Sequence, residues 1–187
     1  ELLIRHMRTH PDRLHTGLNV LTENTLRLID SLRRAPISGI FYAVQHASYD
    51  VMSEDEYRVF GLPYDRKIIE ALPEKWWFNM VHLHGQAPMF RLFSSDLRIQ
   101  AINWHDRETE PDLALGKSQF NGAVCGGLAR WQHLHQGTPT AIREAARDAI
   151  HQTSGRRFIM STGCVIMITT PQSNIRAVRD VAETAGV

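Results

Sequence analysis

The chain has 187 residues, of which 43% are hydrophobic and 22% charged, a balance typical of one globular domain and not of a disordered segment. Its 21 Lys and Arg nearly cancel its 20 Asp and Glu, which argues against a nucleic acid or an acidic membrane surface as a partner. No apolar stretch approaches the roughly 20 residues that span a bilayer, and residues 1–10 are too charged for a signal peptide, so we expect a cytoplasmic protein. Only two cysteines are present, which indicates reduced thiols and not a disulfide scaffold.

The chain is expected to begin with a helical lead-in over residues 1–36. Leucines recur near helical spacing across residues 2–35, and Pro36 ends the pattern. From residue 37 to residue 187 the composition changes to short runs of β-branched and aromatic residues. We therefore divide the chain into residues 1–36 and residues 37–187.

Five short runs in the second segment predict β-strands, because they are rich in β-branched and aromatic residues and are followed by polar residues. They cover residues 37–44, 77–83, 98–104, 120–127 and 157–164. Runs that alternate with helices at this spacing predict βαβ units, and hence an α/β fold with a parallel sheet and flanking helices.

Helix-start signals follow several of these runs. Ser53 and Glu56 have the spacing of a capping box. Thr138-Pro139 and Thr170-Pro171 each place a capping residue before a proline, which is tolerated at the first helical position. These signals predict helices that begin near residues 54, 139 and 171.

Two histidines and a cysteine lie at the ends of predicted strands. His82 and His84 are two residues apart, so in a strand their side chains point to the same face, and Cys164 ends the last predicted strand. Imidazole nitrogen and thiolate sulfur are the ligands that zinc prefers, and three protein ligands leave one position open for a substrate. We therefore predict a catalytic zinc site at His82, His84 and Cys164, with two hydrogen-bonded histidines and a buried thiol as the alternative.

Other strand ends carry polar side chains that are candidates to contact a substrate or cofactor: Gln45, Asn103 and His105. In parallel α/β folds such groups gather at the carboxyl ends of the strands. A second His-x-His pair, His133 and His135, is expected in a polar loop.

An ordered set of motifs across residues 37–180 resembles the uroporphyrinogen decarboxylase superfamily, which includes decarboxylases of haem synthesis and cobalamin-linked methyltransferases. The motifs are Gly39 to Gln45, Glu56 to Phe60, Pro63-Tyr64-Asp65, Val81 to Gly85, Cys125 to Leu128, Ser161 to Cys164, Thr170-Pro171 and Asn174-Ile175. The resemblance implies a (β/α)8 TIM barrel. Such barrels need about 250 residues, so this chain is expected to form the C-terminal portion of one.

The methyltransferase branch resembles this chain most in its site. Its motif His-x-Cys-Gly and a later Cys bind zinc, which activates a thiol to accept a methyl group from a corrinoid. His82 matches that His and Cys164 matches the later Cys, whereas His84 stands where a Cys is expected. The resemblance thus implies a zinc enzyme, with a corrinoid on a partner protein and a small molecule as substrate. An imidazole in place of a thiolate leaves more positive charge on the metal.

Two alternatives remain open on the sequence. The first is a metal-free decarboxylase that acts on a tetrapyrrole, although Cys164 stands where that branch usually has a His. The second is a non-catalytic fragment or interaction domain, because an incomplete barrel exposes strand edges and the inward face of its sheet. Such a chain is expected to self-associate, for example as a homodimer.

Overall fold

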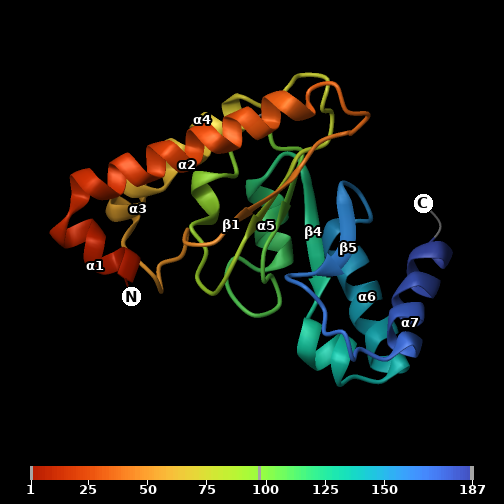
Figure 1. The fold of residues 1–187 in the computed structure, drawn as a ribbon. Coiled ribbons are helices and arrows are strands. Elements are labelled where there is room, and N and C mark those ends of the chain that lie inside the picture. The colour runs from red at the N-terminus through yellow and green to blue at the C-terminus, as the bar shows by residue number, and fades with distance from the viewer. Residues whose placement is uncertain (1, 97, 186–187) are drawn as a thin grey trace.

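The structure of the chain is a computed structural model that describes residues 2–96 and 98–185, shown in Figure 1. Residues 1, 97, 186 and 187, which belong to the predicted segments 1–36 and 37–187, lie outside the described residues. Within the described part, no helix is both long and apolar enough to cross a membrane.

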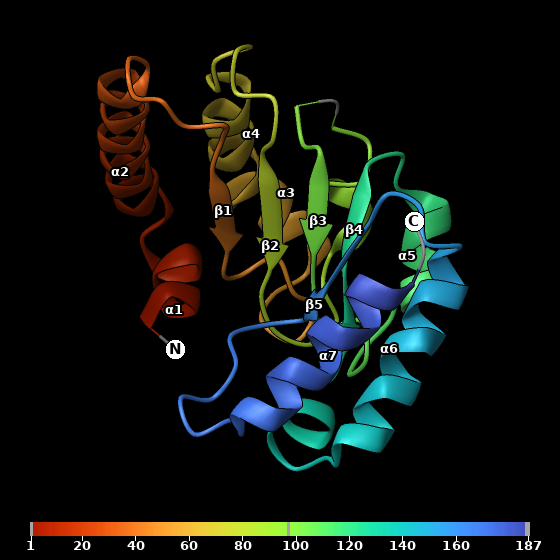
Figure 2. The same cartoon turned by 90° about the vertical axis from the view of Figure 1, so that its right-hand side faces the viewer.

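Five parallel strands form one sheet in which the spatial order equals the order along the chain, as Figure 2 shows. The strands are β1 (Phe41–Val44), β2 (Met80–Leu83), β3 (Ala101–Asn103), β4 (Ala123–Leu128) and β5 (Phe158–Thr162). All four pairings are parallel. The α/β architecture predicted from the sequence is therefore confirmed. Each strand has fewer residues than its predicted run. β1 and β2 keep only the carboxyl-terminal part of their runs, and β4 extends one residue past its run, to Leu128.

Two helices precede the sheet, α1 (Leu2–Thr9) and α2 (Pro11–Leu32), where one helical stretch over residues 2–35 was expected. The stretch divides at Pro11, which lacks an N–H to continue a helix but is well suited to begin one. Helix α2 ends before Pro36, as the sequence indicates, and packs against α4 (Leu62–Glu70).

The remaining helical elements are α3 (Glu54–Phe60), η1 (Phe90–Leu92), α5 (Leu113–Gln119), the π-helix η2 (Arg130–His135), α6 (Pro139–Thr153) and α7 (Gln172–Thr184). The capping box at Ser53 and the Thr138 cap are confirmed. The predicted Thr170 cap is wrong: Pro171 itself directly precedes α7, and the Thr170 hydroxyl makes no hydrogen bond with any described residue. The second His-x-His pair lies in η2 and not in a loop.

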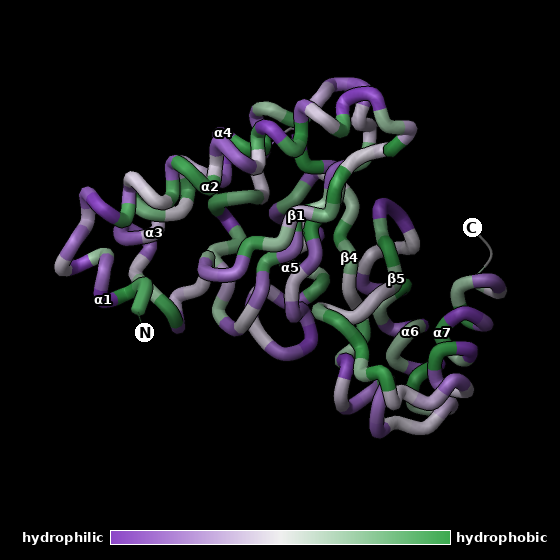
Figure 3. Tube along the Cα trace, in the orientation of Figure 1, coloured by the Kyte–Doolittle hydropathy of each residue, from purple (hydrophilic) through white to green (hydrophobic). Residues whose placement is uncertain are grey.

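The two faces of the sheet differ sharply in burial. Val81, Ile102 and Val124 share one register row and are fully buried on the helix-covered face. On the other face, His82 and Asn103 are paired with one another and are buried, but Phe41 of the edge strand β1 is 61% exposed. Figure 3 shows hydrophobic and hydrophilic residues alternating along α2 and α7, as expected for helices with one buried side.

Candidate metal centre

Four side chains with metal-binding atoms meet at the carboxyl ends of three strands. His82 and His84 come from β2 and the loop after it, His105 follows β3, and Cys164 follows β5. Taking one ligand atom from each, these atoms all lie within 4.8 Å of one another. The three imidazole rings are 5.8–6.2 Å apart between centroids.

The glycine before the cysteine lets the end of β5 approach the end of β3. A Cβ at Gly163 would lie 2.5 Å from the Cα of His105 and 2.6 Å from the Trp104 carbonyl oxygen, distances that no side chain tolerates. Because Gly163 has no side chain, Cys164 can lie beside His105.

Asn103 fixes the orientation and the tautomer of His82. The Asn103 amide nitrogen donates to the carbonyl oxygens of Cys125 at 2.8 Å and Thr162 at 3.0 Å, so its amide oxygen must be the atom that faces His82. That oxygen only accepts, and it lies 2.6 Å from His82 Nδ1. His82 therefore carries its proton on Nδ1, which leaves the lone pair of Nε2 free for a metal.

His105 shows the same arrangement with a carboxylate. Its Nδ1 lies 3.1 Å from the carboxylate of Glu108, an acceptor, so Nδ1 donates. His105 is 3% exposed, and its Nε2 is buried without a hydrogen-bond partner among the described residues. A buried ring nitrogen without a partner is costly in an apoprotein, and a bound metal ion would satisfy it.

His84 is less constrained than the other two imidazoles. Its Nδ1 lies 3.8 Å from Cys164 Sγ, and the side chain is only partly buried. Burial lowers the pKa of both His84 and His82, and the neighbouring His105 contributes to both shifts. The lowered pKa values favour the neutral imidazoles that bind metal ions.

The donor set fits zinc. In a tetrahedral zinc site, bond lengths of about 2.0–2.3 Å place the ligand atoms roughly 3.3–3.8 Å apart, so the four atoms need to move inward by only about an ångström. The sequence indicated three ligands and an open fourth position. The structure adds His105, which was expected to contact a cofactor, to the group that can hold the ion.

The two other predicted contact residues lie elsewhere. Asn103 is buried beneath His82 and acts as its hydrogen-bond partner. Gln45 is exposed at the end of β1 and lines a cavity of about 170 Å³ with residues of α1 such as Leu3 and Met7. Gln45 is thus absent from the metal-capable group formed by the described residues.

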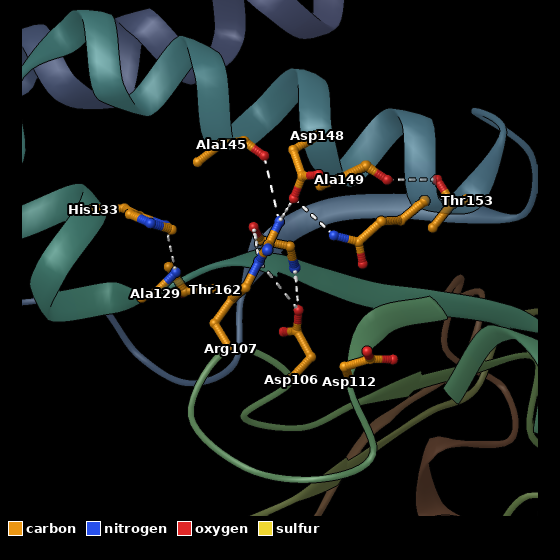
Figure 4. A network of polar contacts seen from close by, with 12 residues as sticks. Asp106, Arg107, Asp112, Ala129, His133, Ala145, Asp148, Ala149, Thr153 and Thr162 are labelled. Carbon is orange, nitrogen blue, oxygen red and sulfur yellow. Dashed lines mark hydrogen bonds and ion pairs between the residues drawn. The ribbon is translucent and has the colours of Figure 1, made fainter. Parts of the chain in front are cut away.

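Sequence reasoning missed the polar network that holds the loop after β3. Arg107 donates to the Gly127 carbonyl oxygen at 2.7 Å and to the Asp148 carboxylate at 2.8 Å, which ties this loop to α6 (Figure 4). Asp106 accepts from the Gly127 N–H at 2.9 Å, and burial raises its pKa to about 6. A Cβ at Gly126 would lie 2.3 Å from the Asp106 carboxylate, so this position has no room for a side chain.

Sequence reasoning also missed Arg130, the first residue of η2. Its positive charge helps to lower the pKa of His84, although burial is the main cause. The available signal was its position just after a strand end, where functional groups gather in parallel α/β folds.

Comparison with known proteins shows which proteins this chain is similar to. Over 137 residues the chain is 26% identical to methylcobamide:CoM methyltransferase MtbA of Methanosarcina mazei, which covers 73% of this chain and 39% of that protein. Over 184 residues it is 26% identical to uroporphyrinogen decarboxylase of Prochlorococcus marinus, covering 93% of this chain and 48% of that one. The chain therefore spans less than half the length of these curated relatives.

A solved structure, described as a methyltransferase from Methanosarcina mazei, has the same fold. It superposes with a TM-score of 0.83 at 20% identity, over 99% of this chain and 53% of the other. The family model described as uroporphyrinogen decarboxylase (URO-D) matches residues 1–185. With nearly its whole length matched, the chain belongs to the uroporphyrinogen decarboxylase family.

Proposed function

We propose that this chain carries the metal centre of a zinc-dependent enzyme that transfers a methyl group from a corrinoid to a thiol acceptor. The observation that carries the proposal is the set of four donor atoms within 4.8 Å, with two imidazoles whose free Nε2 atoms are fixed by their partners. The name of the relative MtbA, a methylcobamide:CoM methyltransferase, gives the reaction class.

His82, His105, Cys164 and His84 would hold the zinc ion. Bound zinc would act as a Lewis acid that lowers the pKa of the acceptor thiol, so that the thiolate forms near neutral pH. Asn103 and Glu108 keep the Nε2 atoms of His82 and His105 directed to the centre, so little rearrangement is needed on binding. Among the described residues, the His84 ring has a hydrogen-bond contact only with Cys164, so His84 is the imidazole most easily moved when the acceptor enters.

The proposed reaction balances without a further reactant. The acceptor loses its thiol proton to solvent and forms a sulfur–carbon bond, while the cobalt–carbon bond of the methylated corrinoid breaks. The electron pair of that bond stays on cobalt, which changes from Co(III) to Co(I). A corrinoid carried by a partner protein would supply the methyl group, and the acceptor is a small molecule.

Elemental analysis of the purified chain tests the metal site. We expect one zinc ion per chain, lost in His82→Ala and in Cys164→Ser. His151→Ala, which changes an exposed histidine of α6, and Cys125→Ala, which changes a cysteine outside the site, are the matched controls and should retain the metal. A wild-type chain that stays metal-free after reconstitution with zinc would contradict the proposal.

Metal-free decarboxylation of a tetrapyrrole is the second candidate. The observation in its favour is that the relative named uroporphyrinogen decarboxylase aligns with 93% of this chain, compared with 73% for MtbA. A metal-free protein that binds uroporphyrinogen, with unchanged affinity in Cys164→Ser, would favour this candidate over methyl transfer.

A further inference from the structure

Arg130 lies at the same edge of the sheet as the metal centre. Leu128, the last residue of β4, is paired with Thr162, the last residue of β5. Arg130 and Cys164 are each two residues further along the chain, so both side chains start from the carboxyl edge of adjacent strands. The effect of the Arg130 charge on the His84 pKa is consistent with this proximity.

The guanidinium of Arg130 has no partner in the part of the chain that the structure describes. It forms no ion pair or side-chain hydrogen bond there, and its Nε atom is buried from solvent without an acceptor. Arg107, on the neighbouring loop, instead donates to Gly127 and Asp148 and is fully engaged (Figure 4). A buried guanidinium N–H without an acceptor is unfavourable unless a ligand supplies one.

The acidic side chains on the neighbouring segments bond to other groups. Glu108 accepts from His105, Asp106 accepts from the Gly127 N–H, and Asp148 accepts from Arg107. Asp106 Oδ1 is buried without a hydrogen-bond partner, but no carboxylate among the described residues forms an ion pair with Arg130. A guanidinium presents N–H groups in a planar fork that matches the two oxygens of a carboxylate, sulfonate or phosphate.

We propose that Arg130 is a specificity-determining residue that binds an anionic oxygen group of the small-molecule substrate. The thiol of that substrate reacts at the metal ion that His84 and Cys164 would help to hold. The inference rests on the proposed function, which places the substrate thiol at the metal centre. It also rests on the unpartnered guanidinium of Arg130, which calls for a negative charge on the substrate. It predicts that this protein prefers anionic thiols to neutral thiols of similar size.

The test uses the whole chain loaded with Co(II), whose absorption changes when a thiolate binds. The probes are 3-mercaptopropionate, which is anionic, and 2-mercaptoethanol, which is neutral. We measure the ratio of the two dissociation constants in each variant. The two probes differ in thiol pKa, but this difference is the same for every variant and does not affect a comparison of the ratios. In Arg130→Gln this ratio should shift by about tenfold or more toward the neutral thiol, because one charge-assisted contact is lost. The affinity for 2-mercaptoethanol and the cobalt stoichiometry should not change.

Two variants define the controls. Arg143→Gln removes an arginine that pairs with Asp180 on the outer helices, and it should leave the ratio unchanged. Arg130→Lys keeps the charge without the planar fork and should restore only part of the preference. An unchanged ratio in Arg130→Gln, or an equal loss of affinity for both thiols, would overturn the inference.

A second measurement needs no metal. Phenylglyoxal modifies accessible arginines, and peptide mass spectrometry then follows each site separately. We expect 3-mercaptopropionate to slow the modification of Arg130 but not of Arg143. If the chain binds no cobalt yet Arg130 is protected, the metal proposal fails and the role of Arg130 stands. If cobalt binds but Arg130 is not protected and the ratio is unchanged, the role of Arg130 fails alone.

Discussion

Single hydrogen bonds decide whether the histidines of this site are ready for a metal ion. Asn103 is 4% exposed, and its two donated bonds to backbone carbonyls leave only its oxygen to face His82. The orientation of His82 is thus set by an amide on the adjacent strand and not by His82 itself. Partners of this kind typically change metal affinity when they are removed.

We predict that Asn103→Leu weakens zinc binding by about 10- to 100-fold, because His82 loses the acceptor that fixes its tautomer. The measurement is competition with a chromophoric chelator on folded protein. Asn174→Leu is the matched control, since Asn174 is 3% exposed and also donates to two backbone carbonyls, those of Leu134 and Gly137. Asn174→Leu should destabilise the fold but leave the zinc affinity unchanged. Equal losses in both variants would show that the effect is general unfolding.

At the level of elements, a buried carboxylate joins the edge strand to two helices. Asp65 of α4 accepts from the hydroxyl of Tyr42 on β1 at 2.6 Å and from the hydroxyl of Tyr57 on α3. Burial raises the pKa of Asp65, whereas both hydroxyl groups lower it. The two tyrosines therefore offset part of the cost of burying the ionised carboxylate.

We predict that Tyr42→Phe lowers the free energy of unfolding by about 1–3 kcal/mol at pH 7, because one carboxylate oxygen loses its donor. Urea denaturation measures this change. Tyr49→Phe is the control, since Tyr49 is 55% exposed and bonds to Glu54 on the surface. The loss in Tyr42→Phe should shrink in acid, because a protonated Asp65 has less need of donors. A loss that is constant with pH would contradict the assignment to the carboxylate.

The start of α3 gives a second prediction on pH. The backbone N–H of Ser53, followed by Arg8, lowers the pKa of Glu56 below 4.5. A carboxylate with a depressed folded pKa stabilises the protein above its unfolded pKa, and this contribution disappears as the pH falls through the folded value. The wild type should therefore lose more stability than Glu56→Gln between pH 6 and pH 3. Thermal melts across this range, with Glu144→Gln on the exposed side of α6 as control, measure the difference.

At the level of the whole molecule, the sheet is open and its inward face is partly uncovered. Phe41 stacks on His82 with ring centroids 5.6 Å apart, yet it remains 61% exposed, and Ile168 in the loop after β5 is fully exposed. The chain covers 53% of the solved methyltransferase with the same fold. Exposed apolar surface of this kind drives association in water.

We predict that the isolated chain self-associates through this face and that Phe41→Lys weakens the association by about tenfold or more. Burying a phenylalanine contributes about 1.5–3 kcal/mol, which corresponds to at least a tenfold change. Sedimentation velocity over a range of concentrations measures the equilibrium. Leu21→Lys is the control, because Leu21 is 64% exposed on α2, away from the sheet. A monomer at all concentrations would contradict the prediction.

The sequence by itself determined the parallel sheet and the approximate position of its five strands, and it singled out three of the four candidate ligands. Strand runs and caps are local signals, so Ser53 and Thr138 could be assigned from their neighbours alone. The pair His82 and His84 was also local, because residues two apart in a strand share a face. Thr170 failed because a threonine before Pro-Gln permits a cap but does not require one.

Only the tertiary structure decided which other side chains at the strand ends come into contact. His105 joined the ligand group because Gly163 lets β5 approach β3, a contact between residues 58 positions apart in the chain. Asn103 became the partner of His82 because its amide is fixed by carbonyls of β4 and β5. Whether Arg130 is paired likewise depends on where the other charges lie. These are contacts between distant segments. Hydrophobic periodicity and residue spacing place side chains at the strand ends but do not determine which of them pair.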